Sequence, residues 1–584
     1  MYINTKNFTI NKFFNSKILF SKTLFSKTLF SKILYLSIIT FLFVIEGNNE
    51  LISQGSANFG NITGQVQFDA QYYREDSLIG AQKISEQILS QGFMALFYTY
   101  NNLEVGIRYE AYQNPLLGID PLFRGQGVPY RYAKYKNDFI EVTAGNFYEQ
   151  FGSGLIFRSY EERALGIDNV MEGLRAKITP TDGLAITALV GKQRLFWGLG
   201  DGIVRAGNLD ANLNSLLPDI MGNDNNVTIG LSAVSKFEPD LQNLLNLPEN
   251  VLSLSGRLGI NNENHLFDLE YAYKYNDPNL TNGFNFNPGQ AWVMNYSYFD
   301  KGIGVAVAMH RLDNMDFRSD RDAALTRVQL GYVPPTTRQH TYRLSSVYPY
   351  GTQFNGEFGA IIDLTYAIPK GSSLGGEYGT TITAGFSKIN NIDTVRTGKY
   401  TYNTDLFNIG DRTYYQDLNF NVLRKFSDFF KASFDFTTQI YDKDILENSG
   451  SPKYGKVKTT SFVFDGTFTI NDDNAIRTEV QHLFAKNDST FKDVDNINGN
   501  WAMFLLEYTV AQHWFLTAWD EYNYGNHFDD RQLHYVNFSV AYVHESTRVS
   551  MTAGKQRGGI LCVGGVCRPV PASNGFSLNI TSTF

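Results

Sequence analysis

The 584-residue sequence has little of several features that mark familiar classes of protein. It contains only two cysteines, which excludes a scaffold held together by many disulfide bonds. Charged residues make up 18% of the chain, below the usual level of about 25%. The net charge of −8 excludes a basic nucleic-acid-binding protein. Past Ile45, the sequence also lacks an apolar run that resembles a membrane-spanning helix.

Aromatic residues, in contrast, are abundant. There are 45 Phe, 35 Tyr and 5 Trp, or 15% of the chain, and hydrophobic residues together make up 43%. A chain with this much apolar and aromatic material does not stay intrinsically disordered. We therefore expect a folded protein that is unusually rich in aromatic side chains.

The N-terminal region has the features of an export signal. Six lysines from Lys6 to Lys32 precede an apolar run from Ile33 to Ile45, and no acidic residue occurs before Glu46. A basic region followed by a short apolar run is typical of a secretory signal peptide. We expect residues 1–55 to be a signal peptide that is cleaved near positions 54–57, and the alternative is an N-terminal membrane anchor.

The rest of the chain alternates apolar and more polar residues with a period of two, which predicts β-strands with one apolar face. The clearest apolar series is Phe358, Ala360, Ile362, Leu364 and Tyr366. The runs at 428–441, 459–470, 475–485 and 533–543 are long. Membrane strands need about 9–11 residues, whereas strands in globular proteins average about 5–6. The lengths favour a transmembrane barrel over a soluble sandwich or propeller.

Connection lengths support the same interpretation. After residue 419, short links such as 471–474 and 511–513 alternate with long ones such as 442–458 and 557–573. Short periplasmic turns and long outer loops are typical of outer-membrane barrels. The sequence therefore predicts an all-β protein in which residues 56–584 form a single transmembrane antiparallel β-barrel of the outer membrane, with roughly 22–26 strands.

The C-terminus ends in a further alternating strand. Phe576, Leu578, Ile580 and the final Phe584 lie at even spacing between polar residues. A last strand that ends in an aromatic residue resembles the assembly signal of outer-membrane barrels. We expect Phe584 to face lipid and to be recognised by the barrel-assembly machinery, and the alternative is an ordinary amphipathic strand that happens to end in Phe.

The densest polar motif, FGSGLIFRSYEERALGIDN at residues 151–169, follows an expected strand near 140–147. Gly152 and Gly154 permit a sharp departure from the sheet. Arg158 and Glu162 would face each other on one helical turn. Clustered charges are costly on a lipid face, so we expect an inward-folded segment that narrows a pore. A solvated loop with surface ion pairs is the alternative.

Further pore-lining candidates are charged residues on the polar faces of expected strands. The full set of candidates is Arg158, Glu161, Glu162, Arg163, Asp168, Glu357, Asp363, Asp435, Arg477, Glu479 and Glu507.

The strings NFYEQFGSGL at 146–155, YEER at 160–163 and GIDN at 166–169 resemble an uncharacterised family of outer-membrane barrel proteins, classed under a domain of unknown function. CVGGVCRPVP at 562–571 resembles the same family near its end. The resemblance covers nearly all of the mature chain. It implies a barrel without an assigned activity, so it transfers no functional residues.

Cys562 and Cys567 flank the central pair Gly564 and Gly565. Gly-Gly favours a tight hairpin turn, across which two cysteines can meet disulfide geometry. Export would place the chain in an oxidising compartment. We expect a disulfide bond rather than reduced thiols or a metal site, because no further ligand lies near in sequence.

Catalytic motifs are absent from the sequence. His513, His527, His534 and His544 lie near acidic residues, but their spacing defines neither a zinc site nor a nucleophile motif. We therefore expect no enzyme, no metal and no cofactor.

The predicted function is a passive pore or small-molecule uptake channel of the outer membrane. A scaffolding barrel of an envelope or secretion complex is the main alternative, and a membrane enzyme is the third. The expected partners are outer-membrane lipid, the assembly machinery and envelope proteins, and no nucleic acid. The sequence leaves the substrate, the oligomeric state and the state of the lumen open.

Overall fold

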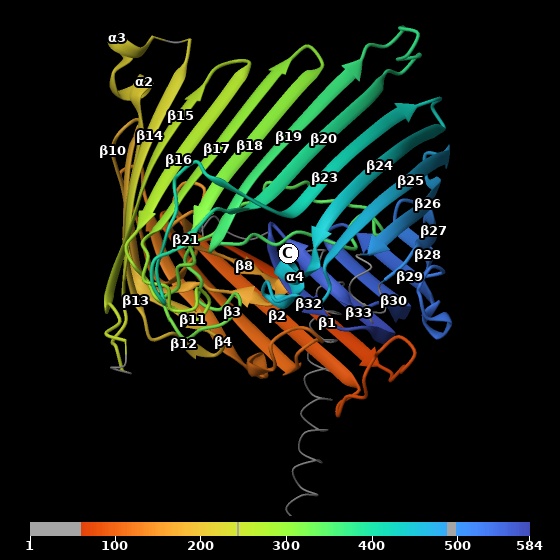
Figure 1. Ribbon diagram of the computed structural model, residues 1–584, viewed down its shortest axis with the longest axis horizontal. Helices are drawn as coiled ribbons and strands as arrows, with labels where there is room; N and C mark the ends of the chain where they lie inside the picture. Colours follow the sequence, from red (N-terminus) through yellow and green to blue (C-terminus); the bar gives the residue numbers. More distant parts are fainter. Residues whose placement is uncertain (1–59, 223, 242–244, 488–497) are drawn as a thin grey trace, which may run out of the picture. The chain divides into compact units, whose positions relative to one another are not determined.

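Twenty-four antiparallel strands follow one another around a closed sheet (Figure 1). The computed structural model describes residues 60–222, 224–241, 245–487 and 498–584. Strand β33 (Ser573–Thr583) pairs with β1 (Asn61–Tyr73), and this pairing closes the barrel. The predicted fold class is confirmed, and the strand number lies within the expected range. The expected signal peptide lies outside the described residues.

Each barrel strand is paired with its neighbours along the chain. The strands are β1 (Asn61–Tyr73), β2 (Ile88–Tyr100), β3 (Leu103–Asn114), β4 (Gly125–Lys136), β5 (Ile140–Phe147), β10 (Met171–Thr181), β11 (Leu184–Leu195), β13 (Ile203–Asn212), β14 (Asn226–Phe237), β15 (Asn250–Asn261), β16 (His265–Lys274), β17 (Gly289–Asp300), β18 (Ile303–Asp313), β19 (Gly356–Ile368), β20 (Thr380–Ile392), β23 (Ile409–Lys425), β24 (Phe430–Asp442), β25 (Lys456–Asn471), β26 (Asn474–Asn487), β27 (Trp501–Val510), β28 (Trp514–Tyr522), β29 (His534–His544), β30 (Thr547–Gln556) and β33 (Ser573–Thr583).

Shorter elements lie in the connections. They are β6 (Glu149–Gln150), β7 (Arg158–Ser159), β8 (Glu161–Glu162), β9 (Ile167–Asp168), β12 (Gly198–Leu199), β21 (Val395–Arg396), β22 (Tyr402–Asn403), β31 (Gly559–Val563), β32 (Val566–Val570), three α-helices, α2 (Leu213–Leu216), α3 (Pro218–Met221) and α4 (Lys443–Asn448), and the 3-10 helices at Pro121–Phe123, Arg163–Leu165 and Asp529–Arg531. Among the described residues, no helix is long and apolar enough to cross a membrane.

The strands present an apolar face to the outside of the barrel. On β29, Val536, Phe538 and Val540 are exposed, whereas Tyr535 and Ala541 on the opposite face are buried. The same alternation places Ile362, Leu364 and other large apolar side chains on the outer surface of the remaining strands. Exposure of such a continuous apolar surface to water is unfavourable, so we expect this surface to lie in the hydrocarbon of a membrane.

The connections are sorted by length between the two rims. One rim, which we call the turn rim, carries tight links such as 101–102, 301–302 and 545–546. It also carries the longer links with α2 and α3 and at 369–379. The opposite loop rim carries long connections, including 148–170, 314–355 and 557–572. The alternation of short and long links that was predicted after residue 419 is present there, whereas the turn-rim links at 213–225 and 369–379 are longer than the loop-rim link at 196–202.

The last residue forms part of the closing seam. The Gly64 N–H donates to the Phe584 carbonyl over 2.8 Å, and the Phe584 N–H donates to the Gly64 carbonyl over 3.0 Å. A Cβ on Gly64 would collide with the Phe584 ring, so the ring packs directly on the backbone of β1. The ring is half exposed on the outer surface, which fits the expected contact with lipid. Its role as an assembly signal stays a prediction.

Candidate functional site

Two connections from the loop rim fold into the lumen. We call residues 148–170, between β5 and β10, the first inner segment, and residues 314–355, between β18 and β19, the second inner segment. Both contain fully buried apolar side chains, such as Ile156 and Leu330. In Figure 1, green chain runs across the inside of the barrel between its walls. The part of the lumen next to the loop rim, which we call the upper lumen, is therefore occupied by the protein's own chain.

The inner segments build an apolar cluster in each half of the barrel. Residues 151–157 and 315–333 pack against buried side chains of β5, β10, β11 and β13 to β18. Residues 344–350 pack against β20, β23 to β27 and β29. The second inner segment thus crosses from one half of the lumen to the other. Burying this apolar surface stabilises the filled state, because the side chains leave water.

The two inner segments also pair with each other through their backbones. The Arg158 N–H donates to the Leu330 carbonyl over 2.7 Å, and the Tyr332 N–H donates to the Gly154 carbonyl over 2.9 Å. Gly154 has a φ of 94°, a conformation that glycine adopts without strain. These bonds satisfy backbone groups that would otherwise be buried without partners.

The inward course of the motif at 151–169 agrees with the sequence interpretation, but the expected helical turn is wrong. Arg158 lies in β7 and Glu162 in β8, so the chain is extended between them. The Arg158 guanidinium lies over the rings of Tyr160 and Tyr332, at 4.4 and 3.9 Å from their centroids. Such cation–π contacts hold the side chain against the second inner segment instead of against Glu162.

A buried charge network holds the first inner segment to the barrel wall. Arg108 on β3 contacts Glu161 at 3.0 Å and Asp168 at 2.6 Å. Arg194 on β11 contacts the same Asp168 oxygen at 2.7 Å and pairs with Glu110 at 2.8 Å. Arg108 also pairs with Glu110 at 2.7 Å. One wall carboxylate and two segment carboxylates therefore surround two wall arginines.

The second inner segment has its own polar anchors. Glu357 at the start of β19 contacts His310 at 2.6 Å and accepts hydrogen bonds from the Gln353 N–H, at 2.7 Å, and from the Tyr350 hydroxyl. Burial, and then the adjacent Glu357 carboxylate, raise the pKa of Tyr350 well above its usual value. The phenol therefore stays protonated and remains a donor. Farther round the wall, His340 contacts Asp417 at 2.7 Å.

The predicted disulfide is confirmed, and its hairpin lies against both inner segments. Cys562 and Cys567 face each other across β31 and β32, with Cα atoms 4.1 Å apart. Gly564 carbonyl accepts from the Tyr332 hydroxyl over 2.9 Å, and Gly565 carbonyl accepts from the Thr352 N–H over 2.9 Å.

A further side chain of the hairpin reaches the first inner segment. Arg568 Nε donates to the Ala164 carbonyl over 2.8 Å. The disulfide hairpin thus contributes hydrogen bonds to both inner segments.

Two cavities lie below the inner segments, toward the turn rim. The larger, of about 670 Å³, is lined by residues of β10 to β17 and by Gly152 and Ser153 at the tip of the first inner segment. The smaller, of about 420 Å³, is lined by residues 338–342 of the second segment and by β23 to β26. The lumen toward the turn rim therefore contains open cavities lined by both polar and apolar residues, whereas the lumen toward the loop rim is filled.

The structure separates the expected pore-lining residues into two groups. The first group lies in the first inner segment and comprises Arg158, Glu161, Glu162, Arg163 and Asp168. The second group lies on the wall and comprises Glu357, Asp363, Asp435, Arg477, Glu479 and Glu507. Only part of the wall group lines a cavity, namely Asp435 and Arg477 in the smaller one. Whether either group contacts a solute stays a prediction.

Several important residues were missed from the sequence. Arg108, Glu110 and Arg194 lie on the inward faces of β3 and β11 and form the wall side of the charge network. The sequence signal for these residues was the spacing of Arg108 and Glu110 at i and i+2. This spacing places two charges on the same face of an amphipathic strand and indicates an inward-facing ion pair. The second inner segment was also missed, although its length far exceeds the usual limit of about 12–15 residues for a loop without regular structure.

Three of the solved structures that match the chain have low sequence identity and low TM-scores. The siderophore receptor PirA from Pseudomonas aeruginosa is 10% identical with a TM-score of 0.39, covering 90% of this chain and 80% of that chain. The translocation pore of the P pilus usher PapC is 7% identical with a TM-score of 0.39, covering 90% and 99%. The outer membrane transporter YddB from Escherichia coli is 9% identical with a TM-score of 0.34, covering 91% and 81%.

No curated protein matches the chain. A family model, described as a family of unknown function (DUF6029), matches residues 27–584. This match spans nearly the whole sequence and agrees with the family resemblance seen in its motifs. The chain belongs to this family of unknown function.

Proposed function

We propose that the protein is an outer-membrane channel for the uptake of small molecules and that its own inner segments form the gate. The observation that supports this proposal is the filling of both halves of the lumen near the loop rim, next to two open cavities near the turn rim. A permanently open passive pore is less well supported, because solute would have to cross two buried apolar clusters. Uptake would therefore require movement of at least one inner segment.

The construction of the gate fits such movement. The inner segments are connections between strands, so they can shift while the ladder hydrogen bonds of the wall stay intact. Their polar anchors to the wall are ion pairs and side-chain hydrogen bonds, of which Arg108 with Asp168 and His340 with Asp417 are examples. Such anchors can be exchanged for contacts to a solute or partner.

A scaffolding barrel remains the second candidate, and the same filled lumen favours it. Apolar clusters with fully buried side chains on every side resemble a permanent core. In this case the inner segments would stay in place and the surface of the loop rim would bind envelope proteins.

Conductance in planar lipid bilayers tests whether the second inner segment closes the lumen, and co-purification of envelope proteins separates the channel from the scaffold. Asp313 and Gly356 are direct partners in the ladder of β18 and β19, so a short Asn-Gly turn can replace residues 314–355 without disturbing the strands. We expect the intact protein to conduct little and the shortened variant to form a large, steady pore. The matched control replaces residues 369–379 on the turn rim, where Ile368 and Thr380 are also ladder partners.

Heat-modifiable gel migration verifies that each variant is a folded barrel. A folded variant without residues 314–355 that conducts no more than the control would contradict the channel. Envelope proteins that co-purify with the intact barrel and are lost with the shortened variant would then support the scaffold.

A further inference from the structure

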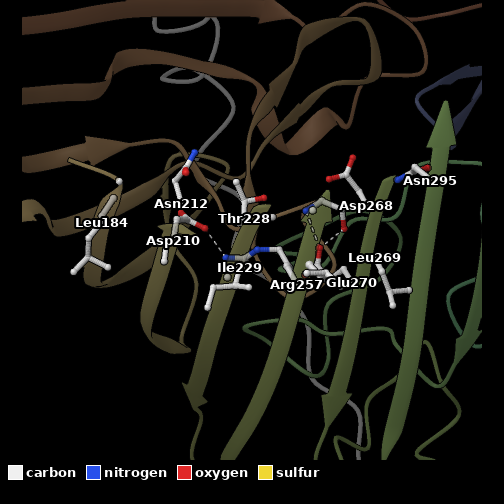
Figure 2. Close-up of a pocket in the computed structure, with 18 of the residues that line it drawn as sticks. Leu184, Asp210, Asn212, Thr228, Ile229, Arg257, Asp268, Leu269, Glu270 and Asn295 are labelled. Atoms are coloured by element: carbon white, nitrogen blue, oxygen red, sulfur yellow. Dashed lines mark hydrogen bonds and ion pairs between the residues drawn. The ribbon is translucent and has the colours of Figure 1, made fainter. Parts of the chain in front are cut away.

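The larger cavity has an uneven distribution of charge. Gly152 and Ser153 line it, and polar side chains such as Asp268 and Asn295 project from its wall (Figure 2). Within it, Arg257 on β15 contacts Asp210 on β13 at 2.8 Å. The guanidinium reaches across Gly230, where a Cβ would collide with it. Arg257 is also the ladder partner of Glu270, so this one cation lies among the three carboxylates of Asp210, Asp268 and Glu270.

Glu270 on β16 connects the cavity to the gate. One of its carboxylate oxygens accepts hydrogen bonds from the Ser153 N–H over 2.9 Å and the Ser153 hydroxyl over 2.7 Å. Glu270 is buried, with an exposed fraction of 5%. Its second oxygen accepts no hydrogen bond from any residue that the structure describes. A buried carboxylate oxygen without a donor is costly and favours a ligand that supplies one.

Asp268 lies two residues before Glu270, on the same face of β16. Its ladder neighbours are Gly259 and Asn295, and its side chain is exposed to the cavity. Within the described part of the chain, it has no ion pair. Figure 2 shows Asp268 on the side of the sheet opposite Leu269.

The remaining cation of the cavity is too distant to compensate these carboxylates. Lys177 is on β10, which is separated from β16 by the strands β11, β13, β14 and β15. At about 4.8 Å between adjacent strands, the path along the wall is about 24 Å. The end of the cavity at Asp268 and Glu270 therefore has an excess of negative charge.

We propose that this cavity binds a small molecule that carries a protonated amine, with the ammonium group at Asp268 and Glu270. An ammonium group supplies several N–H donors together with the missing positive charge. A metal ion fits less well, because no cluster of three or more His, Cys, Asp or Glu suited to a metal occurs among the described residues. The volume of about 670 Å³ is typical of a small-molecule site.

Equilibrium binding to the purified full barrel in detergent tests this proposal. The probe is 1,4-diaminobutane, and the matched probes 1,4-butanediol and succinate replace its amines by neutral or negative groups. We expect saturable calorimetric binding of the diamine alone. Asp268→Asn should weaken it by about tenfold or more, because a charge-assisted hydrogen bond is lost, and Glu270→Gln should weaken it as well.

The control variant is Asp435→Asn, which removes a carboxylate from the smaller cavity in the other half of the barrel. It should bind the diamine like the unchanged protein. Equal binding of diol and diamine, or unchanged affinity in folded Asp268→Asn, would overturn the proposal. The result is independent of the bilayer experiment, because binding to the closed barrel requires no conductance.

Discussion

Asp168→Asn should release the first inner segment from the wall while leaving the barrel folded. The Asp168 side chain is 8% exposed and contacts Arg108 and Arg194, whose side chains are 6% and 3% exposed. The network contains three arginines, with Arg163, and three carboxylates, so its formal charge is 3 − 3 = 0. The asparagine leaves a buried charge of +1 with nearly the same side-chain shape.

Breaking a buried pair from one side costs about 3–5 kcal/mol, because the remaining charge is left without compensation. At about 1.4 kcal/mol per factor of ten, the open form of the segment should become about 10² to 4 × 10³ times more populated. Hydrogen exchange followed by mass spectrometry measures this directly. Peptides from residues 148–170 should lose protection by about that factor, and peptides from the barrel strands should keep theirs.

Glu162→Gln is the matched control on the same segment. Among the described residues, its carboxylate accepts one exposed hydrogen bond, from the Ala164 N–H at 3.1 Å, so its loss should leave exchange nearly unchanged. Protection of residues 148–170 that is equal in Asp168→Asn and Glu162→Gln would refute the reasoning. It would show that apolar packing alone holds the segment.

Three further predictions concern the seam, the hairpin and a loop. Gly64→Val should reduce the amount of heat-modifiable barrel, because the valine side chain would collide with the Phe584 ring. Phe584→Asp should also reduce it, because a charged side chain replaces the ring on the lipid-facing surface. Normal amounts of folded barrel in both variants would contradict a role for this contact. The double variant Cys562→Ser and Cys567→Ser should still fold, because a disulfide that closes so short a ring contributes less stability than the roughly 3 kcal/mol of a 15-residue loop. Its hairpin should be cleaved faster by protease added to intact cells. Cleavage at the normal rate would count against stiffening of the hairpin by the disulfide. Burial opposes ionisation of Asp444, yet the N–H groups of Tyr454 and Lys453 lower the pKa of its carboxyl below the usual value. The stability that the ionised carboxylate contributes is therefore present above about pH 4 and is lost as the pH falls through the lower folded pKa. Hydrogen exchange in residues 444–455 should rise in that pH range, and Asp444→Asn should remove the pH dependence.

The barrel could be predicted because its signals are local. The alternation in 428–441 and 475–485 identifies β24 and β26 to within two residues, since a wall strand must present one face to lipid. The Gly564 and Gly565 pair identifies the hairpin turn, where both residues have positive φ. In each case, a few adjacent residues determine the local structure.

The gate could be predicted only in part, because its contacts join residues that are distant in sequence. The glycines and charges of 151–169 indicated an inward segment, but the partners Arg108 and Arg194 lie on strands with no local mark of their role. Residues 314–355 have no regular alternation, so their course depends on the shape of the cavity they fill. The site at Asp268 depends on which side chains reach their neighbours across the wall, which no strand pattern specifies.

The pairing of β1 with β33, which includes the contact between Gly64 and Phe584, makes β33 a condition of closure. The seam joins the first described strand to the last one, and its final two hydrogen bonds are made by the last residue itself. A chain that ended before β33 would expose the unpaired edges of β1 and β30 to hydrocarbon, where each unsatisfied backbone group costs several kcal/mol. A barrel without β33 would therefore stay open along these two edges, so the single strand β33 decides whether the sheet can close.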